Sequence, residues 1–381
     1  MPAANAAGIS ADKERDSCKM ERKNCWKQYS DKRLNKMEEY TKEYMHFLNH
    51  SKTERECADT VVNLVEKEGF KDLAALVRDK KKLKAGDKVY ATWMNKAVIL
   101  CRIGEKPMEE GMNIVASHID SPRLDIKPNP LYENTGVAYL DTHYYGGIKK
   151  YQWVTLPLAI HGVVVKKDGI TEEICIGEDK DDPVVFISDL LPHLSQEQQE
   201  KKASELFGGE ALDIVFGNRP MVKKGDEKEE KEAVKAQILR LLEEMYDMKE
   251  EDFLSAELEV VPAGKAREAG LDRSMIMAYG QDDKVCAYAA IHALLHAKKL
   301  ARTSVVMLTD KEEIGSYGAT GMTSHFYENA LAEIMNLTGE YSSLKFRRAM
   351  AASNLLSADV SSVFDPMFAD SFEQKNVAYL G

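Results

Sequence analysis

The spacing of apolar residues is helical at the start of the chain and changes further on. Residues 12–50 are highly charged but carry apolar side chains at intervals of three and four, which predicts an amphipathic helix or a pair of helices. A second helix is predicted over 53–68, with Gly69 just past its end, where glycine commonly stops a helix. A short third helix is predicted over 71–82.

After these helices the pattern becomes that of strands. Short apolar or β-branched runs bounded by glycine and proline occupy 88–94, 97–103 and 112–117. From about 130 to 190 the sequence stays strand-like, with glycine-rich or charged turns between the segments 136–145, 153–167, 170–177 and 183–188. This second group of strands predicts an antiparallel β unit.

A charged stretch then leads back to alternating strands and helices. Residues 195–252 contain a charge run at 223–235, which we interpret as a solvated face, and a helix over 234–246. Beyond it the pattern predicts strands at 256–261, 274–279, 303–309 and 353–358, and helices at 284–300 and 324–336. The chain is therefore expected to hold an α/β catalytic domain over 1–129 and 263–381, interrupted by a mostly β insert over 130–262.

Composition narrows the class of protein. The 381 residues are 44% apolar and 30% charged, with a formal net charge of -11. This excludes a disordered chain, a collagen-like fibre and a small disulfide scaffold. No apolar run is long enough for a transmembrane helix, so we expect no membrane partner. The acidic balance argues against nucleic acid as a partner, because phosphate binding needs clustered positive charge.

The N-terminus and the cysteines indicate the compartment. The first residues lack the basic start and apolar stretch of a secretory signal. The six cysteines are scattered, with no C-x-x-C pair: Cys18, Cys25, Cys57, Cys101, Cys175 and Cys286. We therefore expect reduced cysteines and a cytoplasmic location, with neither a disulfide framework nor a thiolate zinc site.

Candidate chemistry lies where predicted strands end in polar residues, the usual place of ligand sites in open α/β sheets. The first such strand ends at Ser117 and delivers His118 and Asp120. Both side chains point the same way in an extended chain, so one can bind a metal while the other orients it. A lone H-x-D pattern is more often a polar strand end without a ligand.

Three further segments carry carboxylates at the same kind of position. Asp282 and Asp283 follow one strand, although aspartate there is also an ordinary helix cap. Glu312 and Glu313 follow an apolar strand, where repulsion and burial would raise a pKa unless a cation is present. Such a pair suits a division of labour in which one carboxylate binds metal and the other moves a proton. Asp359 follows a fourth strand.

Taken together, the four segments predict a paired divalent metal site. One imidazole with several carboxylates suits zinc or manganese, and a carboxylate can bridge two ions. Other catalytic patterns are weak: His292 and His296 are four apart but lack the glutamate of H-E-x-x-H, so we interpret them as helix-face histidines. Neither a G-x-S-x-G motif nor a phosphate-binding G-x-x-x-x-G-K-S/T loop is present.

At these segments the sequence resembles the M18 metallo-aminopeptidases, which include aspartyl aminopeptidase and aminopeptidase I, and most of all their bacterial members. The likeness covers nearly the whole chain from about residue 35. The motifs that carry it are HIDSPRLDIKP, GQDDKVCA, DKEEIGS and SADVSSVFDP. Related two-metal peptidases share the H-x-D…D…EE…D plan but usually lack the Ser-Pro after H-x-D.

The resemblance implies a zinc site with two ions per subunit, in which Mn²⁺ or Co²⁺ can substitute. His118 and Asp359 are expected to bind the first metal and Glu313 the second, while Asp282 bridges both.

It also implies the reaction. Glu312 is expected to act as the general base on a metal-bridging water that attacks the first peptide bond, and Asp120 to orient His118. The expected substrates are short peptides, from which the N-terminal residue is removed.

The family's architecture is expected as well. It has an α/β catalytic domain of phosphorylase/hydrolase type, with the insert serving as a dimerisation domain. The expected assembly is a dimer-based dodecamer that encloses a chamber.

One departure concerns the second metal, which in the family is completed by a histidine near the C-terminus. Here the last histidine, His325, precedes Asp359 and lies in no matching motif. We therefore expect a C-terminally truncated fragment that is inactive or weakly active and holds at most one metal firmly. The alternatives to an aminopeptidase are a related metal-dependent deacylase or amidase, and a truncated, non-catalytic subunit for peptide binding or assembly.

Overall fold

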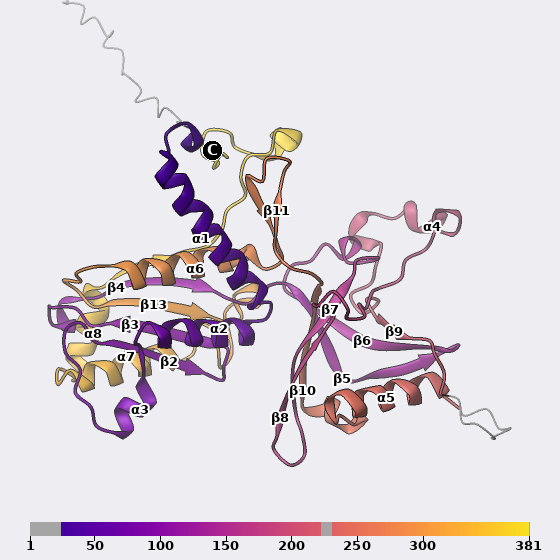
Figure 1. The fold of residues 1–381 in the computed structure, drawn as a ribbon, viewed down its shortest axis with the longest axis horizontal. Coiled ribbons are helices and arrows are strands. Elements are labelled where there is room, and N and C mark those ends of the chain that lie inside the picture. The colour runs from indigo at the N-terminus through magenta and orange to yellow at the C-terminus, as the bar shows by residue number, and fades with distance from the viewer. Residues whose placement is uncertain (1–23, 222–230, 381) are drawn as a thin grey trace, which may run out of the picture. The chain divides into compact units, whose positions relative to one another are not determined.

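A computed structural model describes residues 24–221 and 231–380 in two units. The larger unit, Thr41–Val360, contains both large sheets and the candidate site. Most of the predicted charge run at 223–235 lies outside the described residues, as do Cys18 and the beginning of the predicted N-terminal helix. Figure 1 shows the elements and their labels.

The smaller unit combines the two ends of the described chain. It holds the short 3-10 helix η1 (Cys25–Lys27), the first part of helix α1 (Asp31–Asn49) and the 3-10 helix η8 (Pro366–Ser371). Near the C-terminal end the rings of Phe364 and Tyr379 stack with their centroids 5.0 Å apart.

The first large sheet has six strands in the order β1-β2-β3-β13-β4-β14. Strand β13 runs parallel to β4, and β4 runs parallel to β14. The central strand β13 is buried along nearly its whole length, as its continuous apolar run predicts, whereas all four residues of the edge strand β14 are exposed. The strands are β1 (Lys71–Asp72), β2 (Lys88–Trp93), β3 (Ala97–Arg102), β4 (Asn113–His118), β13 (Ser304–Thr309) and β14 (Asn354–Ser357).

Helices cover this sheet on both faces. Helix α2 begins with a capping box, in which the Thr53 side chain accepts from the Glu56 backbone and the Glu56 side chain accepts from the Thr53 backbone. Helix α6 packs along β4 and β13 (Figure 1), while α3, α7 and α8 share a buried apolar cluster with alternate residues of the strands. These helices are α2 (Glu54–Lys67), α3 (Leu73–Arg78), α6 (Gln281–His296), α7 (Phe326–Leu337) and α8 (Ser343–Ala352).

The second large sheet is wholly antiparallel, with the order β8-β7-β10-β5-β6-β9. It has its own apolar core, into which helix α5 (Ala233–Tyr246) contributes Val234, Ile238 and Leu242. The strands are β5 (Arg123–Asn134), β6 (Val137–Tyr145), β7 (Leu158–Val165), β8 (Thr171–Ile176), β9 (Ile214–Gly217) and β10 (Ala256–Pro262), and a short helix α4 (Gln196–Gln199) lies between β8 and β9 in sequence.

Most predicted elements are present, and the mixed α/β class is confirmed. The predicted strand at 183–188 forms only isolated bridges, through Val185 and Phe186. The predicted strand at 274–279 is outside both large sheets: it is β12 (Met275–Met277), which pairs only with β11 (Arg267–Ala269). Helix α8 was not predicted. None of the described helices is long and apolar enough to cross a membrane.

Candidate metal centre

Three of the four predicted segments converge because their strands are neighbours in one sheet. Thr309 of β13 pairs with His118 of β4, and Ser357 of β14 pairs with Ala116, all in parallel register. Parallel strands place their carboxyl ends on the same edge, so the residues that follow β4, β13 and β14 gather there.

The fourth segment reaches the same edge by a different route from the one predicted. The strand before Asp282 is not part of this sheet, because β12 pairs only with β11. Asp282 and Asp283 are delivered instead by the first turn of α6, which packs against β4 and β13. This segment follows a strand, as predicted, but that strand lies outside the first large sheet, and its carboxylates reach the cluster through the start of α6.

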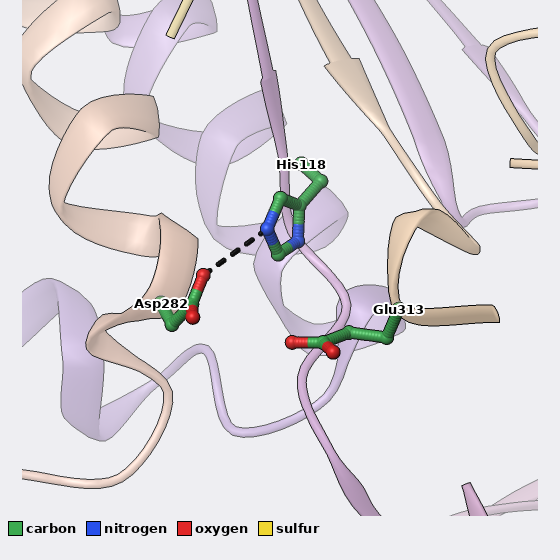
Figure 2. A group of neighbouring side chains, drawn as sticks. All are labelled: His118, Asp282 and Glu313. Carbon is green, nitrogen blue, oxygen red and sulfur yellow. Dashed lines mark ion pairs between the residues drawn. The ribbon is translucent and has the colours of Figure 1, made fainter. Parts of the chain in front are cut away.

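The side chains form two overlapping groups whose ligand atoms lie within 4.8 Å of one another: His118 with Asp282 and Glu313, and His118 with Asp283 and Asp359. Figure 2 shows the first group, with His118 on the strand, Asp282 at the start of the helix and Glu313 on the facing turn. The Nε2 atom of His118 lies 3.2 Å from the Asp282 carboxylate and 3.9 Å from that of Asp359.

Glu312 lies beside these groups without belonging to either. Its Oε2 atom is 3.8 Å from Nε2 of His118, and its side chain is 45% exposed. Both glutamates are on the short 3-10 turn η7 (Glu312–Ile314) that follows β13. Of the adjacent pair, Glu313 thus lies among the potential ligands and Glu312 faces the open side.

Asp120 is fully buried and holds several parts of the site together. Its Oδ1 atom lies 3.3 Å from Nδ1 of His118, which is also 3.1 Å from the Asp120 backbone carbonyl oxygen, and accepts from the backbone N–H of Glu312. Its Oδ2 atom accepts from the backbone N–H of Glu313 and, at 2.7 Å, from the hydroxyl of Tyr145. One buried carboxylate therefore contacts the imidazole, the turn that carries both glutamates, and a tyrosine.

Negative charge dominates the cluster and shifts the pKa values of its members. Burial alone would lower the pKa of His118, but its hydrogen bond to Asp120 and the surrounding carboxylates raise it to about 9. Burial and the charge of Asp282 raise the pKa of Glu313 to about 7. A single imidazole is too little positive charge for so many carboxylates, so the cluster favours a cation.

The donor set fits divalent metal ions. Imidazole nitrogen with carboxylate oxygens is a ligand combination that zinc and manganese accept. Asp283 provides an independent indication: its Oδ2 atom accepts from the Ser117 hydroxyl at 2.7 Å, while its buried Oδ1 atom has no hydrogen-bond partner. A buried carboxylate oxygen without a partner is costly unless a cation satisfies it.

Sequence reasoning located the cluster but missed some of its contacts. It gave no role to Asp283 beyond its position, and it treated Tyr145 only as part of a strand. No local signal marks Tyr145, since its hydrogen bond to Asp120 joins residues that are 25 positions apart and belong to different sheets or their ends. His292 and His296 belong to neither group; they lie on α6 with ring centroids 4.0 Å apart, as expected of helix-face histidines.

A family model described as "Aminopeptidase I zinc metalloprotease (M18)" matches residues 47–381. The match covers most of the chain, which therefore belongs to this family of zinc aminopeptidases.

Individual relatives agree with this assignment. The chain is 52% identical over 361 residues to a probable M18 family aminopeptidase 1 of Clostridium acetobutylicum, covering 95% of this chain and 77% of that protein. The crystal structure of an M18 aminopeptidase from Thermotoga maritima is similar with a TM-score of 0.87 and 44% identity, covering 95% of this chain and 77% of the other. The crystal structure of aminopeptidase I from Clostridium acetobutylicum is similar with a TM-score of 0.83 and 50% identity. The match covers 94% of this chain and 77% of the other.

Proposed function

We propose that the cluster holds two divalent metal ions, zinc in the first instance, and removes the N-terminal residue from short peptides. The observation that carries the proposal is the pair of ligand groups sharing His118, with Glu312 adjacent to both but part of neither. His118, Asp282, Glu313 and Asp359 are the proposed ligands. Because Asp283 also lies within ligand distance of His118 and Asp359, it is a further candidate.

Bound metal ions would supply Lewis-acid stabilisation of developing negative charge and would acidify a water molecule. The residues of the chain supply the rest. Glu312 accepts a proton from the attacking water, the water oxygen adds to the carbonyl carbon of the first peptide bond, and Glu312 returns the proton to the leaving amine. Asp120 keeps the His118 ring in place through its contact with Nδ1.

The general base can be tested by Glu312→Gln, which keeps the size of the side chain and removes its basicity. We expect kcat on an aminoacyl peptide to fall by about 10²–10⁴-fold, with zinc content unchanged. Glu333→Gln, on α7, is a matched control outside the cluster. An unchanged kcat in Glu312→Gln would show that another group takes the proton.

The alternative enzymatic function is a deacylase or amidase using the same metal set. Peptides with a free N-terminal amine and their N-acetylated counterparts separate the two, because an aminopeptidase needs the free amine. We expect turnover of the free-amine peptides only. Zinc binding without turnover of either series would favour the non-catalytic subunit. The number of zinc ions per chain distinguishes the two ions proposed here from the expectation, drawn from the missing C-terminal histidine, that at most one is firmly held.

We also propose that the chain forms a homo-oligomer, with the dodecamer expected from the resemblance as its specific form. The support within the chain is a segment after β8 with several large apolar side chains exposed: Val184, Phe186, Leu190, Leu191 and Leu194. Sedimentation velocity tests this directly, and a monomer at micromolar concentration would overturn it.

A further inference from the structure

We propose that Tyr145, from the antiparallel sheet, is a positioning residue for the metal centre: its hydroxyl fixes Asp120 and thereby the His118 ring. This inference rests on the proposed function, because it concerns the same site. Tyr145 is the last residue of β6, it is buried, and its hydroxyl donates to Oδ2 of Asp120 at 2.7 Å. The metal centre would then depend on both large sheets.

The contact matters because Asp120 has several partners to hold at once. Its two oxygens serve the His118 ring and the backbone N–H groups of both Glu312 and Glu313, the latter two at 3.2 Å. Without the tyrosine hydroxyl, the Oδ2 atom loses the shorter of its two hydrogen bonds, 2.7 Å against 3.2 Å from the Glu313 backbone N–H. A rotation there would disturb the imidazole and the glutamate turn together.

The tyrosine ring is itself held by a buried cation. The guanidinium carbon of Arg123 lies 3.8 Å from the centroid of the Tyr145 ring, a cation–π geometry. Arg123 is buried and pairs with three carboxylates, Asp125 at 2.8 Å, Glu259 at 3.1 Å and Glu54 at 3.3 Å. This network leaves the ring little freedom, so the hydroxyl meets Asp120 in one orientation.

The next residue gives independent evidence that the end of β6 is fitted against the site. Gly146 has φ of +73°, and a β-carbon added to it would lie 3.1 Å from the β-carbon of Glu313 and 3.3 Å from Oε2 of the same side chain. The backbone just past β6 thus approaches a proposed ligand so closely that a β-carbon at this position would fit only if the Glu313 side chain shifted slightly.

The test is Tyr145→Phe, which keeps the ring and its stacking on Arg123 but removes the hydroxyl. Tyr144→Phe is the matched control, because the preceding strand residue points to the other face and is 38% exposed. The zinc affinity of the full chain is measured by competition with a chromophoric chelator. We expect Tyr145→Phe to bind zinc about 10–100-fold more weakly than wild type, as substitutions of groups that support a ligand do, and Tyr144→Phe to match wild type.

Arg123→Lys is a second variant that keeps the charge but loses the flat guanidinium against the ring. We expect its zinc affinity to lie between those of Tyr145→Phe and wild type. A general loss of stability is distinguished by the unfolding midpoint of the metal-free chain, which such a loss would lower without a selective change in zinc affinity. The inference is overturned if both variants bind zinc as tightly as Tyr144→Phe.

Asp282→Asn separates this inference from the function on which it rests. If Asp282→Asn binds zinc as well as wild type, the proposed metal centre is wrong. If Asp282→Asn loses zinc while Tyr145→Phe and Arg123→Lys retain it, the metal centre stands and only the role of Tyr145 fails.

Discussion

The candidate centre has a buried side and an open side, which differ in how their residues are held. On the buried side, His118 and Asp120 are 3% and 0% exposed, and Asp120 contacts an imidazole, two backbone amides and a tyrosine. On the open side, Asp359 is 54% exposed and follows β14, whose residues are all exposed. The buried side is therefore fixed by several contacts within the fold, whereas Asp359 on the open side contributes charge from an exposed edge of the sheet.

The largest expected effect is that of Asp120→Ala on stability. The substitution leaves the Tyr145 hydroxyl and two backbone N–H groups without their acceptor in a buried place. Removing one partner from such a buried charged network typically costs about 3–5 kcal/mol. Urea unfolding of the metal-free chain measures it. A loss below about 0.5 kcal/mol would mean that the buried side is no better held than the open side.

The next largest expected loss of stability is that of Gly146→Ala, for which Gly136→Ala is a matched control. Both glycines have positive φ, +73° and +75°, so alanine at either should cost about 1–2 kcal/mol. Nothing lies within 4 Å of a β-carbon at Gly136, whereas Gly146 meets Glu313. We therefore expect only Gly146→Ala to weaken zinc binding as well, measured by chelator competition. Equal zinc affinities in the two variants would show that the Glu313 side chain can move away from the added β-carbon without weakening zinc binding.

Sequence patterns predicted the strands and side chains of the buried side but not the contacts that Asp120 makes with Tyr145 and the glutamate turn. The strand that ends at His118 and the strand before Glu312 and Glu313 were recognisable as short apolar runs. The second run is continuous, which marks a strand covered on both faces. Parallel pairing then brings their ends together without further information. The likeness of the motifs to a known family added the roles of individual residues.

The remaining features depend on contacts between distant segments. β12 has a strand-like sequence but pairs only with β11, and no local pattern shows which partner a strand takes. The proposed role of Tyr145 depends on the register between β5 and β6, which pairs Arg123 with Tyr145 and so places the guanidinium against the tyrosine ring. Helix α8 was overlooked because its ten residues show only a short apolar face, with Phe346 and Ala349 buried.

A smaller expected effect is the pH dependence of stability that His161 causes. His161 on β7 contacts Glu56 on α2, and this contact is expected to be independent of the metal centre. Burial alone would lower the pKa of His161 on β7, but hydrogen bonds with Cys175, Glu178 and Glu56 raise it to about 11. A histidine whose pKa is raised on folding stabilises the fold fully below its unfolded pKa near 6.5. That contribution is lost as the pH rises from about 6.5 towards 11.

The measurement is the free energy of unfolding of the metal-free chain between pH 7 and pH 8, in wild type and in His161→Gln. One proton gives a slope of at most about 1.4 kcal/mol per pH unit, with stability falling as the pH rises. We expect His161→Gln to lose this slope and to keep wild-type zinc affinity. An unchanged slope would show that His161 is not the titrating group.

The smallest expected effect on stability is that of Asp359→Asn, on the open side. Surface substitutions of this kind usually change stability by less than about 0.5 kcal/mol, so the urea midpoint should stay that of wild type. Zinc affinity should nevertheless fall, because Asp359 shares a ligand group with His118 and Asp283. A large loss of stability in Asp359→Asn would contradict the contrast between the two sides.

The most direct test of the proposed metal centre is the zinc retained per chain after dialysis against a weak chelator, in wild type and in Asp282→Asn. This substitution keeps the shape of the side chain 3.2 Å from Nε2 of His118 and removes its charge. We predict that wild type retains zinc and that the variant loses it. Its zinc affinity should fall by more than the roughly 100-fold that follows the loss of a group which only supports a ligand. Equal zinc contents in the two proteins would contradict the assignment of this cluster as the metal centre.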